Sequence, residues 1–186
     1  MKIKVLFLIF ASIAGGFLCS CERILGDDFS DVRISLSEEI QVSYIGSADS
    51  AVSDTVVSFS EEIAATGNKD YLINRSKLTS IELDNFEYQI KNRVDGTADS
   101  VHSATFFVEK PDGAFVVLGT EPGFRLINGM QKKINQLNEE GRMAINQSFY
   151  KDNPGKAKIK VELKMGNLPA NFILAPKLDL ILKTKL

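Results

Sequence analysis

One stretch of nine residues decides the fold: Ala157-Lys158-Ile159-Lys160-Val161-Glu162-Leu163-Lys164-Met165. Its five apolar side chains alternate with four charged ones, so that all the apolar ones point the same way in an extended chain. This is the pattern of a strand with one face in the core and the other in water. A charge at Val161, in the middle of the apolar face, should therefore unfold the domain.

The same alternation of period two recurs on both sides of this strand. The C-terminal stretch repeats the pattern and predicts a final ordered strand. Asp179, Lys183 and Lys185 face outward in it, and the inward side chains are Leu178, Leu180, Leu182 and Leu186. Upstream, the pattern predicts a strand pair or one bent strand over 32–44, a short strand around 57–59, a strand over 81–90 with a bulge at Asp84-Asn85, and a hairpin over 104–118 that turns at Lys110-Pro111-Asp112-Gly113.

One segment has helical spacing instead. Its apolar residues lie three and four positions apart and predict a crossover helix near 129–140, with Asn128 as a cap and Gly141 at its end: Ile127, Met130, Ile134 and Leu137. A shorter helical turn is expected over 69–75, where Asn68 can cap it.

Many short strands, turn signals between them and one main helix are typical of an all-β domain. We therefore predict that residues 32–186 form an antiparallel immunoglobulin-like β-sandwich with one crossover helix. A parallel α/β fold would need helices that alternate with the strands, and the sequence lacks them.

Composition excludes several classes of function. The chain has 186 residues, two Cys, one His and no Trp, which is too few ligands for a structural zinc site. The sequence motifs of dinucleotide-binding proteins, P-loop enzymes, α/β-hydrolases, zinc proteases and calcium loops are all missing. We therefore expect no enzyme activity, no cofactor and no metal.

The first 20 residues are expected to be an export signal. Lys2 and Lys4 precede an apolar run over 5–18 that is too short for a membrane span and is interrupted by Gly15 and Gly16. Without this segment, 166 residues remain with 20 positive and 24 negative charges, a net charge of −4. An acidic chain without a basic cluster is not expected to bind nucleic acid.

Leu18-Cys19-Ser20-Cys21 resembles the lipobox of bacterial lipoproteins. The resemblance implies that Cys21 carries the lipid (palmitate among the acyl chains) and that residues 21–31 form a lipidated tether. Cys19 departs from the pattern, because Ala, Ser or Thr is commoner at that position. If Cys19 itself carried the lipid, the bulky Leu18 would stand directly before it, where the lipobox has a small residue. The alternative is that both cysteines are buried apolar residues of the signal helix.

The same resemblance suggests a location and partners. Glu22, rather than Asp, follows Cys21, which favours the outer membrane of a Gram-negative bacterium; the leaflet, periplasmic or surface-exposed, stays open. The expected function is a non-enzymatic binding or assembly module of the cell envelope, held on the membrane by its lipid anchor. A polysaccharide or another envelope protein is the expected partner. The alternative is a glycan- or lipid-binding surface lipoprotein, with an aromatic platform drawn from Tyr44, Tyr71, Tyr88 and Tyr150.

Three short motifs resemble the acceptor sites of bacterial O-glycosylation. They are Asp49-Ser50-Ala51, Asp54-Thr55-Val56 and Asp99-Ser100-Val101, and they predict modification of Ser50, Thr55 and Ser100. The alternative is ordinary loop composition, since Asp and Ser are common turn residues.

Two single residues of the 101–108 strand also need a location. His102 is expected to be either a half-buried histidine with a hydrogen-bond partner or an edge residue, and not a catalytic one. Phe107 must lie on the opposite face from Phe106, where we expect the helix to cover it; the alternative is an exposed apolar patch.

Overall fold

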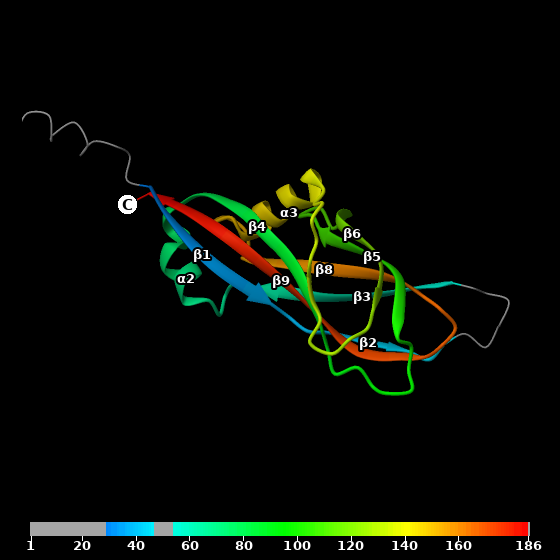
Figure 1. Cartoon of the computed structure of the whole chain (residues 1–186). Coiled ribbons are helices and arrows are strands. Elements are labelled where there is room, and N and C mark those ends of the chain that lie inside the picture. Colours follow the sequence, from blue (N-terminus) through cyan, green and yellow to red (C-terminus); the bar gives the residue numbers. More distant parts are fainter. Residues whose placement is uncertain (1–28, 47–53, 186) are drawn as a thin grey trace, which may run out of the picture.

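The computed structural model describes residues 29–46 and 54–185, which form two antiparallel sheets packed face to face (Figure 1). Sheet A contains β1 (Phe29–Ser37), β2 (Ile40–Tyr44), β4 (Leu78–Lys91), β7 (Gln131–Lys133) and β9 (Ala170–Lys185). Sheet B contains β3 (Thr55–Ala64), β5 (Ser100–Glu109), β6 (Phe115–Arg125) and β8 (Lys156–Met165). The prediction of a mainly β, antiparallel sandwich is confirmed.

The strands pair as nested partners around one central hairpin. β5 pairs with β6, β4 with β7 outside them, β3 with β8 next, and β1 and β2 with β9 outermost. The strand orders are β1-β9-β4-β7, with β2 also on β9, and β3-β8-β5-β6. Nested pairing rolls one long ribbon into two sheets, which is the topology of a jelly roll. In an immunoglobulin-like sandwich the first strand pairs with the second, whereas here it pairs with the last, so the immunoglobulin-like prediction is wrong.

β1 and β2 are two halves of one bent edge strand. Ser37 lies opposite Lys177 and Ile40 opposite Leu174, so both halves keep the same register against β9 across the break at 38–39. Of the two alternatives for 32–44, the structure therefore has the single bent strand. β1 begins at Phe29 and takes in residues 29–31, which the sequence assigned to the tether.

β8 and β9 lie inside their sheets and supply much of the core. The five apolar residues of β8 from Ala157 to Met165 are each at most 2% exposed, and the charged residues between them face outward. β9 has 16 residues and lies between β1 and β4, with Leu178, Leu180 and Leu182 buried. Both strand predictions are confirmed.

The predicted bulge and hairpin are also present. The register of β4 against β9 shifts between Leu83 and Asn85, which leaves Asp84 as the extra residue. β5 and β6 are joined by a turn in which the Lys110 N–H donates to the Ala114 carbonyl at 2.8 Å. Gly113 takes a φ of 85° in this turn, a value that favours glycine.

The crossover helix lies further along the chain than predicted. α3 spans Glu139–Phe149, and the predicted span 129–140 contains β7 instead. The backbone of this segment bonds to β4: the Ile90 N–H donates to Met130 O at 2.9 Å and the Ile134 N–H to Phe86 O at 3.0 Å. These bonds along the sheet edge outweigh a helix-like spacing of apolar residues, so the helix prediction is wrong in position.

Asn138 caps the start of α3, and its side chain accepts from the N–H groups of Glu140 and Gly141. Gly141, expected to end a helix, lies in the first turn of this one. A Cβ there would lie 2.5 Å from Val117 O and 2.6 Å from Leu118 Cα of β6. Glycine thus allows α3 to pack closely on β6, and the helix also contacts β4.

The short helix α2 (Lys69–Asn74) confirms the prediction for 69–75. The Asn68 side chain accepts from the Tyr71 N–H at 3.0 Å, as a helix cap does. A 3₁₀ turn, η1 (Arg75–Lys77), leads from α2 into β4. Tyr71 is buried and donates its hydroxyl hydrogen bond to Phe149 O at 2.8 Å, which connects α2 to the end of α3.

Candidate functional site: a polar sheet face and an open side

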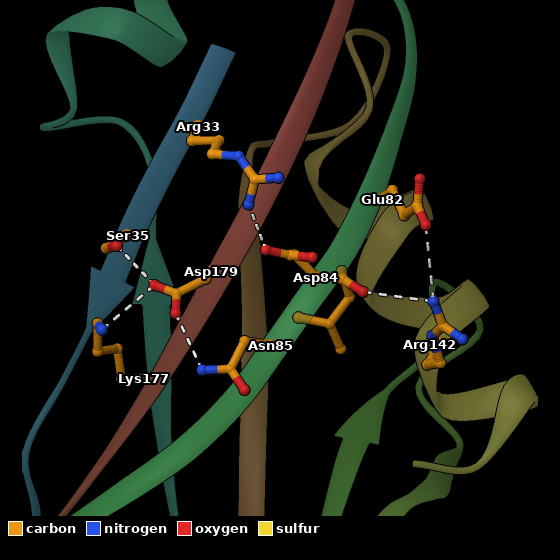
Figure 2. A network of polar contacts seen from close by, with 9 residues as sticks. Arg33, Ser35, Glu82, Asp84, Asn85, Arg142, Lys177 and Asp179 are labelled. Carbon is orange, nitrogen blue, oxygen red and sulfur yellow. Dashed lines mark hydrogen bonds and ion pairs between the residues drawn. The ribbon is translucent and has the colours of Figure 1, made fainter. Parts of the chain in front are cut away.

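The outward face of sheet A carries a network of polar side chains centred on Asp179 of β9 (Figure 2). Ser35 of β1 donates to Asp179 Oδ1 at 2.5 Å, Asn85 of β4 donates to Oδ2 at 3.0 Å, and Lys177 Nζ lies 3.3 Å from Oδ1. Burial opposes the negative charge, but the hydrogen bonds from Ser35 and Asn85 and the Lys177 ammonium outweigh it and lower the pKa of Asp179. One carboxylate therefore links three neighbouring strands.

The network continues beside the bulge in β4. The extra residue, Asp84, directs its carboxylate toward Arg33 of β1, at 2.5 Å (Figure 2). On the other side, Arg142 of α3 donates to Leu83 O at 3.4 Å and lies 3.9 Å from the Glu82 carboxylate. The polar face thus joins β1, β9, β4 and α3.

The hollows on this face are lined by these same polar groups. One of about 280 Å³ is bordered by Arg33, Asp84 and Asp179, and one of about 400 Å³ lies beyond Asp84 and is bordered by Lys133 and Arg142. Small-molecule sites are mostly apolar, with a few polar groups that orient the ligand. Because these polar groups bond to one another, the face is better suited to holding strands together than to binding a small molecule.

The single histidine lies in a second polar cluster, at one end of sheet B. His102 Nδ1 contacts the Asp54 carboxylate, whose other oxygen lies 2.7 Å from Lys164 Nζ. The hydrogen bond from Lys164, followed by that from His102, lowers the pKa of Asp54. His102 is exposed, so it is not a core histidine. Within residues 29–46 and 54–185, no three His, Cys, Asp or Glu side chains are placed to hold a metal.

The predicted modification sites are only partly within the described residues. Cys21 and Ser50 lie outside them. Thr55 is the first residue of β3 and Ser100 the first of β5, each at the end of a strand. Lipidation of Cys21 and O-glycosylation of Ser50, Thr55 and Ser100 stay predictions.

The tyrosines do not form an aromatic platform. Tyr71 and Tyr88 are fully buried, and burial raises the pKa of both. Tyr44 and Tyr150 are partly buried against the core. Phe107 does face outward, but Lys160 lies over it, with Nζ 4.1 Å from the ring centroid. A lysine therefore covers this ring where we expected the helix.

The sandwich is closed on one side and open on the other. On the closed side, Leu137 forms a bridge with Gly119 of β6, and the Asn138 N–H donates to Leu118 O at 2.9 Å. On the open side, β3 forms the edge of sheet B and β1 and β2 form the edge of sheet A, with β3 in contact with both (Figure 1). No strand among the described residues pairs with either of these free edges.

No protein-family model and no curated protein match this chain. Several solved structures of viral particles and their proteins are similar. The decameric BFDV capsid protein has a TM-score of 0.46 at 9% identity, covering 82% of this chain and 99% of that one. Desmodium yellow mottle tymovirus has 0.37 at 12% identity, with 84% and 90% covered. The nodavirus particle of the giant freshwater prawn Macrobrachium rosenbergii has 0.38 at 10%, with 87% of each chain covered.

These findings correct the expected identity and function. The strand order is that of a jelly roll, which overturns the immunoglobulin-like body. The identification as a bacterial lipoprotein is corrected too, because no family model and no curated protein supports it. The assignment as an envelope binding module, with glycan or lipid binding as the alternative, is wrong with it. No helix in the described part of the chain is long and apolar enough to cross a membrane. The expected location and partners stay predictions.

Proposed function

We propose that this chain is a non-catalytic structural protein, a jelly-roll building block that joins other subunits through the open side of its sandwich. The observation that carries the proposal is the pair of free strand edges, β3 in one sheet and β1 with β2 in the other. An edge strand presents unpaired N–H and C=O groups that can bond to a further strand. Here two such edges lie next to each other, so the open side offers main-chain hydrogen bonds from both sheets.

The polar face of sheet A supports the same role. Its charges form ion pairs within the molecule, such as Lys177 with Glu87 at 2.7 Å and Lys183 with Glu82 at 3.2 Å. Side chains engaged in this way hold the sheet together and leave few groups to bind a ligand. The capsid proteins named above are similar in fold, but the proposal rests on this chain's own free edges.

Sedimentation velocity tests the proposal. The sample is the full-length chain as it is purified from the expression host, with no segment removed afterwards. Concentrations from about 1 to about 100 μM cover the range of weak and moderate association. We expect a defined assembly larger than the monomer, whose share rises with concentration. A folded chain that sediments as a monomer at every concentration overturns the proposal.

A location in the cell envelope and attachment to a membrane through Cys21 are separate predictions from the sequence, and association through the open side does not depend on them.

A further inference from the structure

We infer that the subunit bound at the open side is a second copy of this chain, and that the two β3 strands pair antiparallel across a two-fold axis through Ser58. This inference rests on the proposed function and names its surface and its partner.

β3 is the best available of the four sheet edges. β7 has three residues, and β6 is joined to the segment before α3. The β1 and β2 edge is interrupted at 38–39, and α2 packs against β1. β3 runs for ten residues without a break, paired with β8 along its whole length. It therefore offers the longest continuous free edge of the described chain.

The direction of the free backbone groups follows from the pairing with β8. Just beyond β3, the Ala65 N–H donates to Gly155 O at 2.8 Å. Ala65 and Gly155 lie opposite each other, because they continue the register in which Ala64 lies opposite Lys156. In an antiparallel pair every second residue exchanges hydrogen bonds with its partner strand. The odd-numbered residues of β3 therefore bond to β8, and the even-numbered ones direct their N–H and C=O groups to the free edge.

The charge pattern limits pairing to one part of this edge. Residues 55–60 contain no charge, no Pro and no Gly and are rich in β-branched and aromatic side chains, a composition that favours pairing with another strand. The Glu62 N–H is already occupied by Glu61 Oε1 at 3.3 Å. Val56, Ser58 and Ser60 are left with free edge groups.

A two-fold axis through Ser58 uses all three of these residues. Ser58 then lies opposite itself, and Val56 lies opposite Ser60 of the second copy, so the three pairs exchange about six main-chain hydrogen bonds. Val57 comes opposite Phe59, and both are partly buried apolar side chains on the core face. Each partner contributes the same surface, as an isologous dimer requires.

The ends of the paired segment are compatible with this register. Asp54 comes opposite Glu62 of the second copy, but each carboxylate already has a lysine of β8 beside it. Lys164 Nζ lies 2.7 Å from Asp54, and Lys156 Nζ lies 2.9 Å from Glu62. The ion pairs within each copy offset the like charges across the axis.

Two double variants of the full-length chain test the register, because Val56 and Ser60 face outward and are exposed. Val56→Lys with Ser60→Lys places lysine opposite lysine at both contacts. Val56→Lys with Ser60→Glu places lysine opposite glutamate. We expect the first to raise the dissociation constant by about 10- to 30-fold and the second to leave it within about threefold of wild type. Sedimentation velocity measures association, and thermal melting by circular dichroism shows that both variants fold.

The outcomes separate this inference from the proposed function. If the wild type assembles and only the lysine–lysine variant loses assembly, the result supports both the structural role and the pairing of the β3 strands. Wild type that assembles while the lysine–lysine variant assembles equally well overturns the β3 pairing and leaves the structural role intact. Equal loss of assembly in both double variants overturns the register. A monomeric wild type overturns the inference and the proposed function together.

Discussion

Replacing Gly141 with Ala should destabilise this protein, although Ala is the better helix former. Gly141 lies in the first turn of α3, where an added Cβ would be 2.5 Å from Val117 O and 2.6 Å from Leu118 Cα. Non-bonded carbon atoms prefer about 3.5–4 Å. The helix must therefore move away from β6 by about 1 Å, since both neighbours are backbone atoms of a paired strand and cannot rotate away.

The size of the effect follows from two opposing contributions. Overpacking of this kind costs about 1–3 kcal/mol, and contacts with backbone atoms place Gly141→Ala at the upper end. In the opposite direction, the change from Gly to Ala inside a helix stabilises the folded state by about 1 kcal/mol. The expected net loss is about 2 kcal/mol in the free energy of unfolding, or about 4–8 °C in melting temperature for a chain of this length.

Gly67→Ala is the matched control, because a Cβ at Gly67 would have no atom within 4 Å and its φ lies outside the left-handed region. This variant should be stabilised by about 0.4–1 kcal/mol, since Ala reduces the freedom of the unfolded chain. Urea unfolding followed by far-UV circular dichroism measures both variants, and the chain has no Trp for fluorescence. If Gly141→Ala is as stable as wild type while Gly67→Ala behaves as expected, α3 does not approach β6 as described.

Three further predictions concern the core, the helix cap and the polar face. Val161→Asp places a charge at a fully buried position of β8 and should abolish the folded circular dichroism spectrum. Asn138→Ala removes the cap of α3 and should lower the urea midpoint by the equivalent of about 1 kcal/mol. Asp179 has a lowered pKa in the folded state, so its contribution to stability is present above the unfolded pKa of about 4 and is lost as pH falls through the folded value. Asp179→Asn should therefore be less stable than wild type at neutral pH and lose less stability on acidification, in urea unfolding measured at a series of pH values; equal acid sensitivity in the two proteins would contradict this.

Alternation along the sequence predicted the strands well because it records a local property, which side of an extended chain faces the core. It predicted β8, β9 and even the bulge at Asp84, where the apolar positions change parity. The pairing of the strands could not be predicted in this way, because a jelly roll and an immunoglobulin-like sandwich bury the same faces. The helix was misplaced for a similar reason. The bonds of Met130 and Ile134 to β4 depend on residues about 40 positions upstream, and a local spacing rule does not include them.

The candidate site was only partly visible in the sequence. The outward direction of Asp179 followed from the alternation in β9, but its contacts with Ser35 and Asn85 depend on strands far away in the chain. The free edge of β3 was missed, since only Val57 and Phe59 marked the strand. The uncharged run over 55–60 is the signal that could have drawn attention to it. Even so, a strand's place at the edge of a sheet is known only once its neighbours are known.

The place of β9 in the middle of sheet A has a consequence for how this protein is made. Ser30 and Thr184, which bond to each other across β1 and β9, are 154 residues apart in the chain. β1, β2 and β4 all pair with β9, so sheet A cannot form until residues 170–185 have left the ribosome. Contacts of such large sequence separation make folding slow. Until residues 170–185 are available, the core-facing apolar side chains of β1, β2 and β4 therefore lack their partner strand in the nascent chain, which favours aggregation.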